Sequence, residues 1–276
     1  MPELPEVEAV RRRLQPAMRG ARIDRVLLRR ANLRQPFPAD FAQRLEGRRV
    51  RAVDRRGKYL LVTLDSGETL LMHLGMSGSF RIDRARMPGG VESAPFDRHD
   101  HVMLMLSNGR VITFNDPRRF GVMDVIGRGA VPVHRAFETM GPEPLSSSFD
   151  AEALAAAVAG KRVALKVALL DQRVVAGLGN IYASEALHLA HLSPLRRSST
   201  IATTTGRPRP AAMRLVEAIR AVLRKAIVRD AGRDQDDRFR VYERDGERCR
   251  TRGCPGTIRR IWQAGRSTFY CPTCQR

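Results

Sequence analysis

The amino terminus holds two residues whose types could do chemistry, Pro2 and Glu3. A methionine before a small residue is the usual context for removal of the initiator, which would leave Pro2 with a free secondary amine. Such an amine titrates near pH ~8, so an appreciable fraction is nucleophilic at neutral pH. Its addition to a sugar aldehyde carbon gives an iminium ion, a strong electron sink, and Glu3 could supply or remove a proton. The alternative is an ordinary capped amphipathic helix over residues 7–18, whose terminal proline has no chemical role.

The second set of reactive side chains consists of two close cysteine pairs near the carboxyl terminus: Cys249-x4-Cys254 and Cys271-x2-Cys274. Two such pairs on successive turns are typical of a tetrahedral zinc site with four thiolate ligands. Four thiolates leave no open position for water, so we expect one structural zinc ion rather than free thiols or disulfides.

Composition narrows the class of protein. The chain of 276 residues has 49 basic and 29 acidic side chains, a net charge of +20, which favours a polyanionic partner over a solvated basic surface. The amino terminus lacks the basic-then-apolar pattern of a signal peptide, and no apolar run reaches the roughly 18 residues of a membrane span. Few cysteines argue against a secreted disulfide framework. A soluble, cytosolic protein with no membrane partner is therefore expected.

The elements that must position these residues differ between the two halves of the chain. Residues 21–125 carry short alternating or apolar runs separated by hairpin turns, which predicts strands. The expected strands are 21–29, 48–55, 59–64, 69–74, 101–106 and 110–114. Two packed antiparallel sheets with flanking helices would bury their apolar faces, so a two-layer β-sandwich is predicted for residues 1–130. The stretch 84–98 has no packing pattern and is expected to be a loop.

The second half has helical periodicity after a proline-rich linker at 131–149. Helices are expected at 150–159, 163–170, 181–190 and 211–228. They form one predicted domain, 150–232, and the cysteine module follows at 240–276. Within that module, 257–263 and 266–270 can pair as a hairpin with Ala264 and Gly265 at its tip. The fold class is therefore α+β, with an N-terminal sandwich, a helical domain and a zinc-ribbon hairpin.

Two stretches of this sequence resemble the formamidopyrimidine-DNA glycosylase family, bifunctional base-excision enzymes of bacteria. They are MPELPEVE at the amino terminus and VAGLGNIYASE at 175–185. The resemblance implies that Pro2 is a Schiff-base nucleophile, that Glu3 helps to open the deoxyribose ring, and that Glu6 supports them. It also implies that Lys58 contacts a phosphate and donates a proton during β-elimination. Arg266, near the hairpin tip, would reach the lesion phosphate and assist the second elimination.

The same resemblance implies a set of contacts to double-stranded DNA that carries damaged bases or abasic sites. The stretches HLGMSGS at 73–79 and NDPRRFG at 115–121 match the family's void-filling residues, which map onto Met76, Arg118 and Phe120. The helical domain would be a helix–two-turn–helix clamp. Its Asn180 would bind a phosphate, and from its place after a glycine turn that residue could also cap the following helix. His99 and Arg162 match further DNA contacts, whereas Lys166 could equally be solvated.

One stretch departs from the family pattern. Residues 229–238 are shorter by roughly a dozen residues than the loop that closes over flipped oxidised guanine in orthodox members. Loops carry substrate-specific contacts, so altered base selectivity is the expected consequence. Two alternatives remain open: an endonuclease VIII-like glycosylase for oxidised pyrimidines, and a non-catalytic protein that binds damaged DNA.

Overall fold

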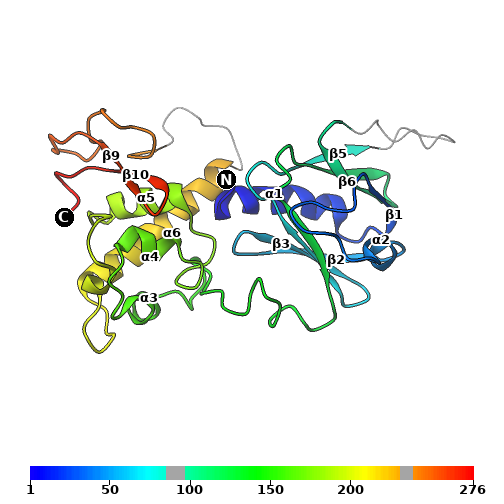
Figure 1. Cartoon of the computed structure of the whole chain (residues 1–276), viewed down its shortest axis with the longest axis horizontal. Helices are drawn as coiled ribbons and strands as arrows, with labels where there is room; N and C mark the ends of the chain where they lie inside the picture. The colour runs from blue at the N-terminus through cyan, green and yellow to red at the C-terminus, as the bar shows by residue number, and fades with distance from the viewer. Residues whose placement is uncertain (85–96, 231–238) are drawn as a thin grey trace. The chain divides into compact units, whose positions relative to one another are not determined.

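The computed structural model describes residues 1–84, 97–230 and 239–276, which form two compact units, Met1–Glu138 and Thr139–Arg276. The first unit is built of antiparallel sheets and the second of helices followed by a β-hairpin, as the two colour ranges of Figure 1 show. The predicted α+β class is confirmed. The predicted loop at 84–98 and the shortened stretch at 229–238 lie largely outside the described residues.

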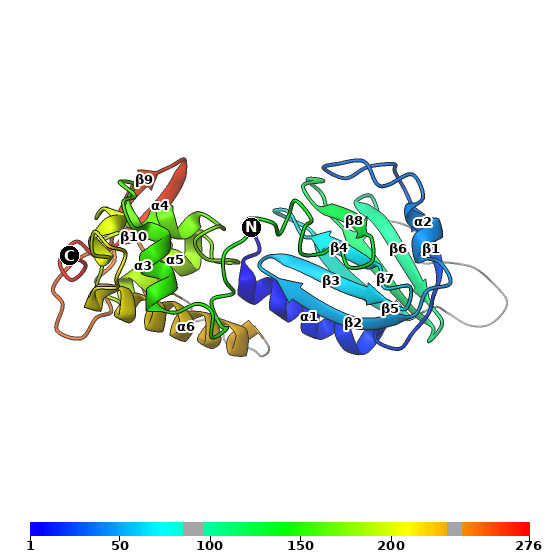
Figure 2. The same cartoon turned by 90° about the horizontal axis from the view of Figure 1, so that it is seen from below.

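The first unit is a sandwich of two four-stranded antiparallel sheets, ordered β1-β6-β7-β5 and β2-β3-β4-β8. Its elements are α1 (Leu4–Met18), β1 (Ile23–Leu28), α2 (Phe41–Leu45), β2 (Val50–Arg56), β3 (Tyr59–Leu64), β4 (Thr69–His73), β5 (Ser79–Arg84), β6 (Asp100–Leu106), β7 (Arg110–Asn115) and β8 (Val122–Ile126). Apolar side chains of both sheets and of α1 form one core. Figure 2 shows α1 running alongside the sandwich. Burying this continuous apolar surface is what holds the helix in place.

Three elements of this unit escaped the sequence prediction: α2, β5 and β8. Strand β5 has only two apolar side chains, Phe80 and Ile82, and its outward Arg81 and Asp83 pair at 2.7 Å. It lies at the edge of its sheet, where it forms backbone hydrogen bonds to a single neighbour, β7. Charged residues are depleted from strands in general, so pairing with β7 rather than local propensity decides this strand.

In the second unit α5 packs against α4, α6 and the hairpin strand β10, and α3 packs against α6. The elements of this unit are α3 (Ala151–Val158), α4 (Leu165–Leu170), α5 (Asn180–Leu189), the 3-10 helix η1 (Ser198–Ile201), α6 (Pro210–Asp230), β9 (Arg259–Gln263) and β10 (Arg266–Tyr270). All four predicted helices and the hairpin are present. Within the described residues, no helix combines the length and the apolarity that crossing a bilayer would require.

The segment predicted as a linker, 131–149, is partly packed. Phe137 is buried in the first unit, where its ring meets Tyr59 edge-on at 5.3 Å. Phe149 is wholly buried in the second unit. Aromatic side chains bury large areas, so both ends of this segment are fixed to their own unit. The predicted boundaries at residues 130, 149 and 240 remain predictions.

Candidate functional site

The start of α1 places Glu3 in a buried position beside the partly exposed Pro2. Glu3 is only 2% exposed and forms the N-cap of the helix, with extended backbone geometry. Its amide donates a hydrogen bond of 2.9 Å to Oε2 of Glu6, one helical turn later. An acidic side chain in the first turn is stabilised by the helix dipole. The helix thus presents an imino acid at its amino end with one carboxyl side chain buried next to it.

Glu8 fixes α1 to the neighbouring strand. Its carboxylate oxygens lie 2.9 Å from Arg11, 2.9 Å from Arg12 and 3.4 Å from Arg55 of β2. Burial raises the pKa of Glu8, but the guanidinium groups, Arg11 foremost, outweigh it and leave that pKa below its usual value. Glu8 is therefore ionised and holds the helix against the sheet.

Lys58, for which the family resemblance implies a phosphate contact, lies in the tight turn between β2 and β3. It is largely buried, with 8% of its surface exposed. Its charge acts on His73 of β4, a residue that the sequence analysis quoted without a role. Burial and then the charges of Lys58 and Arg34 lower the pKa of His73 to about 4. The imidazole is consequently neutral at physiological pH. Its Nδ1 accepts a 3.0 Å hydrogen bond from the amide of Gly75.

The structure brings together Met76, Arg118 and Phe120, the three predicted void-filling residues. Met76 and Phe120 are 41% and 40% exposed, although both are large and apolar. The Arg118 guanidinium lies 4.8 Å from the centre of the Phe120 ring. Gly75 has a φ of +62°, and a Cβ on it would lie 2.4 Å from the Phe120 carbonyl carbon. Only glycine therefore lets the loop after β4, which carries Met76, touch the loop before β8, which carries Arg118 and Phe120.

A buried carboxylate that sequence reasoning missed, Asp116, ties these loops together. Its Oδ1 accepts 2.6 Å from the Ser77 hydroxyl, and its Oδ2 accepts 2.7 Å from the Gly121 amide. Two histidines hold its backbone. Its amide donates to the carbonyl of His99, a predicted DNA contact that is partly buried, and its carbonyl oxygen lies 2.9 Å from Nε2 of the buried His101. Asp116 lies inside the stretch NDPRRFG that matches the family, but that motif drew attention to Arg118 and Phe120 and gave no sign that the Asp116 carboxylate is buried.

We expect Asp116→Ala to lower the free energy of unfolding by about 2–4 kcal/mol, because the buried amide of Gly121 loses its acceptor. Denaturant unfolding measures this effect. Asp65→Ala, in an exposed hairpin turn, is the matched control and should change stability by less than ~0.5 kcal/mol. Equal stability of the two variants would show that Asp116 does not organise the loops.

In the second unit, the amino end of α5 is joined to the hairpin by Asn180. The predicted cap is wrong: Gly179 is the N-cap, and Asn180 is the first helical residue. Its side chain instead accepts 2.7 Å from Nζ of Lys166 and donates 3.0 Å to the carbonyl of Ser267. Because Gly179 occupies the N-cap position, the side chain of Asn180 is not needed there and can make these two contacts.

Lys166 is buried rather than solvated. Besides Asn180, its ammonium group donates to the Ser267 carbonyl at 3.0 Å and to the Thr268 hydroxyl at 2.7 Å. These three acceptors come from α5 and β10, whereas Lys166 belongs to α4. A buried charge persists only where such partners compensate its desolvation. The lysine therefore locks the hairpin onto the helices.

Lys166→Met should destabilise the second unit by about 3 kcal/mol, since three oxygen acceptors lose a charged donor. The expected readout is earlier denaturant unfolding together with faster amide exchange in β10. Lys161→Met serves as the control, because the Lys161 side chain is partly exposed and its ion pair with Asp171 is long at 4.0 Å and therefore weak. If both variants unfold alike, the buried contacts contribute no net stability.

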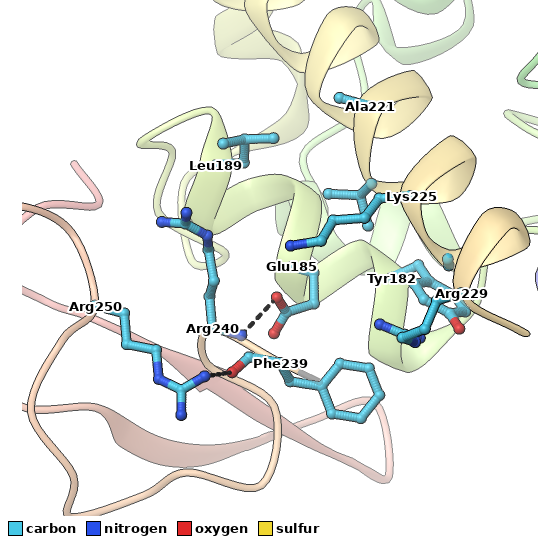
Figure 3. Close-up of a pocket in the computed structure, with 11 residues that line it drawn as sticks. Tyr182, Glu185, Leu189, Ala221, Lys225, Arg229, Phe239, Arg240 and Arg250 are labelled. Atoms are coloured by element: carbon cyan, nitrogen blue, oxygen red, sulfur yellow. Dashed lines mark hydrogen bonds between the residues drawn. The ribbon is translucent and has the colours of Figure 1, made fainter. Parts of the chain in front are cut away.

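The other end of the ribbon module is anchored by Glu185, inside the VAGLGNIYASE stretch. Its two carboxylate oxygens accept three backbone hydrogen bonds of 2.8–2.9 Å, from the amides of residues 240–242. A cavity of about 330 Å³ lies beside it between α5 and α6. Figure 3 shows four basic side chains around this cavity: Lys225, Arg229, Arg240 and Arg250. Because both oxygens of Glu185 serve the backbone, its role is structural.

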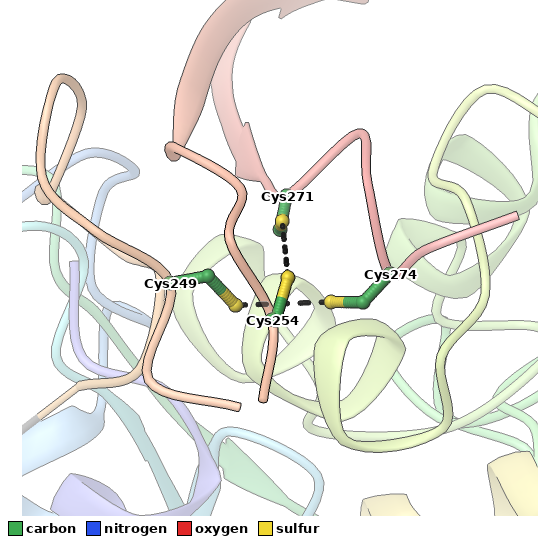
Figure 4. Close-up of side chains that lie close together, drawn as sticks. All are labelled: Cys249, Cys254, Cys271 and Cys274. Atoms are coloured by element: carbon green, nitrogen blue, oxygen red, sulfur yellow. Dashed lines mark hydrogen bonds between the residues drawn. The ribbon is translucent and has the colours of Figure 1, made fainter. Parts of the chain in front are cut away.

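The four cysteines come together as predicted. Their sulfur atoms all lie within 4.8 Å of one another, and the Cys249–Cys274 and Cys254–Cys271 pairs are each 3.7 Å apart (Figure 4). Tetrahedral zinc with Zn–S bonds of ~2.3 Å requires sulfur separations of about 3.8 Å. The separation is too long for a disulfide, and all four are free. The cluster thus fits one tetrahedral metal ion.

Two further predicted residues are exposed basic side chains of this unit. Arg266 is the first residue of β10, directly after the two-residue hairpin tip, and pairs with Gln263. Arg162 precedes α4. Both are available to a polyanion, as an arginine that binds phosphate must be.

Comparison with known proteins agrees with this architecture. The formamidopyrimidine-DNA glycosylase N-terminal domain family matches residues 1–123, and the formamidopyrimidine-DNA glycosylase H2TH domain family matches residues 140–237. The first match covers most of the sandwich, including Pro2 and Glu3, and the second covers the helices with the glycine turn before α5. The chain therefore belongs to the formamidopyrimidine-DNA glycosylase family.

Several relatives resemble the chain along its whole length. Proteins named formamidopyrimidine-DNA glycosylase from Afipia carboxidovorans and a Bradyrhizobium species are each 54% identical over 297 residues, with all of both chains covered. A Lactococcus lactis formamidopyrimidine-DNA glycosylase, solved non-covalently bound to DNA with an abasic site, is 30% identical with a TM-score of 0.86 and 99% of each chain covered. The Thermus thermophilus protein is 37% identical with a TM-score of 0.82, over 99% of this chain and 98% of that one.

Proposed function

We propose that this protein is a base-excision DNA glycosylase with abasic-site lyase activity, which removes oxidised or ring-opened purines from duplex DNA. The observation that carries the proposal is the amino terminus: an imino acid at position 2 with the buried Glu3 beside it, in a member of this family. A free secondary amine and a neighbouring acid are the two groups that iminium chemistry on a sugar needs.

In the proposed reaction, the Pro2 nitrogen forms a bond to C1′ of the deoxyribose while the bond from C1′ to the damaged base breaks. The proton that the Pro2 nitrogen loses is taken up by the departing base. Glu3 donates a proton to the ring oxygen as the C1′–O4′ bond breaks, which leaves the iminium ion. Loss of a C2′ proton then expels the 3′ phosphate, and a second elimination expels the 5′ phosphate. Lys58 and Arg266 serve these two steps as proton donor and phosphate ligand.

Duplex DNA is the proposed partner. The exposed pair Met76 and Phe120 suits a wedge that fills the space left by an extruded nucleotide, which costs a few kcal/mol to unstack. Arg118 would face the orphaned base, where a guanidinium can hydrogen-bond to a base edge. The net charge of +20 favours the phosphate backbone, for which His99, Arg162, Asn180 and Arg266 are the proposed ligands.

The metal proposed for the cysteine cluster is zinc. Cys249, Cys254, Cys271 and Cys274 would hold it, and it would act structurally, because four thiolates complete its coordination. The ion would fix the turns that carry the hairpin and so position Arg266. We further propose that the protein acts as a monomer in the bacterial cytosol. The proposed domains are a catalytic sandwich at 1–130, a linker at 131–149, a helical DNA-binding domain at 150–232 and the zinc ribbon at 240–276.

Base selectivity rests on the shortened stretch at 229–238, of which residues 231–238 lie outside those described. We propose a weaker grip on 8-oxoguanine than on ring-opened guanine, with abasic-site cleavage retained, because that reaction needs no base pocket. A Lactococcus lactis relative has also been solved with DNA that contains an oxidised pyrimidine. Oxidised pyrimidines are therefore among the lesions to be tested as substrates.

Single-turnover excision on otherwise identical duplexes tests these proposals. We expect base release from ring-opened guanine to exceed release from 8-oxoguanine, and covalent trapping by borohydride on an abasic duplex. A normal preference for 8-oxoguanine would refute altered selectivity alone. Faster excision of oxidised pyrimidines would favour the endonuclease VIII-like alternative. Binding without trapping or cleavage would identify a non-catalytic damaged-DNA binding protein.

A further inference from the structure

A histidine of α5 faces the cysteine cluster from outside it. His188 is 1% exposed, and its Nε2 lies 3.4 Å from Sγ of Cys249 and 3.2 Å from the hydroxyl oxygen of Thr251. It is not one of the four side chains whose donor atoms converge on a common point. Its position is therefore that of a neighbour to a metal ligand rather than a ligand.

The surroundings of the ring decide which nitrogen carries the proton. Within the part of the chain that the structure describes, the buried Nδ1 has no hydrogen-bond partner. A neutral imidazole has one N–H group, and placing it on Nδ1 would bury an unpaired donor. Placing it on Nε2 directs it at the Cys249 sulfur and the Thr251 oxygen. The Nε2–H tautomer is thus the one that the packing favours.

Thr251 extends the same arrangement to a second sulfur. Its amide donates to Cys249 at 3.4 Å, and its hydroxyl oxygen lies 3.8 Å from Sγ of Cys274. With the proton of His188 on Nε2, the Thr251 hydroxyl is free to donate its own proton to Cys274. One side of the cluster therefore has a chain of donors that runs from α5 through Thr251.

We propose that His188 is a positioning residue for the metal site, which donates an Nε2–H···S hydrogen bond to the Cys249 thiolate. The proposal rests on the zinc site proposed above. Four thiolates around a divalent ion carry a net charge of −2, and donors to the sulfur atoms offset it and fix the direction of each ligand. Outer hydrogen-bond partners of metal ligands typically change metal affinity or activity by 10–100-fold.

The contact also ties the metal site to α5, two helical turns beyond Asn180. Glu185 and His188 lie on that helix, and both hold the ribbon module, one through backbone amides and the other through a ligand. Loss of the His188 donor should therefore loosen the ligand on the α5 side first. The effect is expected at Cys249 rather than at Cys254, whose sulfur accepts from the amide of Gly256 at 3.4 Å.

The test compares zinc release from the full-length protein into excess chromophoric chelator for four forms. We expect His188→Phe, which keeps a ring but has no donor, to release zinc about tenfold faster than wild type. His188→Gln, which carries an N–H group near the position of Nε2, should restore most of the difference. His191→Asn is the control, because His191 is exposed and has a φ of +57°, which asparagine tolerates. With cobalt in place of zinc, the thiolate-to-metal charge-transfer band should move to lower energy in His188→Phe only.

Two results would overturn the proposal: wild-type release and an unchanged charge-transfer band in His188→Phe, or equal acceleration in the Phe and Gln variants, which would indicate packing instead of a hydrogen bond. Circular dichroism at the assay temperature verifies that each variant is folded. A wild-type protein that retains no zinc would refute the proposed metal site itself. The two failures are therefore distinguishable.

Discussion

Protein in which extra residues precede Pro2 is expected to lose covalent trapping on abasic DNA by at least about a thousandfold. The extension converts the Pro2 nitrogen into a tertiary amide, which has no basic lone pair, while every side chain of the site remains. The readout is the yield of borohydride-trapped adduct against time on an abasic duplex, followed by mapping of the linked residue. Wild-type adducts should map to Pro2.

A matched control separates the chemistry from effects on binding. Pro36→Ala replaces an exposed proline of the same unit and should trap at the wild-type rate. Duplex affinity of the extended protein, measured at fixed salt, should fall much less than trapping does, because phosphate contacts dominate affinity. If the extended protein traps normally, or if adducts map to another residue, Pro2 is not the nucleophile.

Replacement of one cysteine by serine is expected to reduce the zinc content from one ion per chain to less than about 0.1 ion per chain. Cys254→Ser leaves three thiolates, and structural zinc sites require their full ligand set for folding. The hairpin β9–β10 has a small core of its own, so without the ion it should lose order. Duplex affinity should fall by about a hundredfold or more, with elemental analysis and filter binding as the measurements.

The control is an exposed polar position on the same module. Thr273→Ser keeps a hydroxyl at a residue that lies between two cysteines and should retain zinc and affinity. Treatment of wild type with a strong chelator should reproduce the Cys254→Ser phenotype, and added zinc should reverse only the chelator effect. A metal-free protein that still binds duplex DNA with full affinity would show that the ribbon is not needed for binding.

The sequence by itself determined the local elements and the short-range motifs. In strand β3 buried and less buried residues alternate, and in helix α6 apolar residues recur every three or four positions, so each element could be predicted from a single period. The spacing of the cysteines was sufficient to predict that their four sulfur atoms meet. The motifs also gave the family, because its residues lie close together in sequence. Such signals depend on neighbours within a few positions, where chain geometry alone fixes which side chains meet.

Only the tertiary structure decided which polar side chains are buried and what they hold. Asp116, Lys166 and His188 look like ordinary turn or helix residues in the sequence, yet each joins elements that are distant along the chain. Asn180 was predicted to cap its own helix, but its contacts lie on α4 and β10. The burial of a polar group is worthwhile only when partners from other elements satisfy it. Those partners are known only once the chain has folded, and therefore the motifs reveal the chemistry while the packing reveals what positions it.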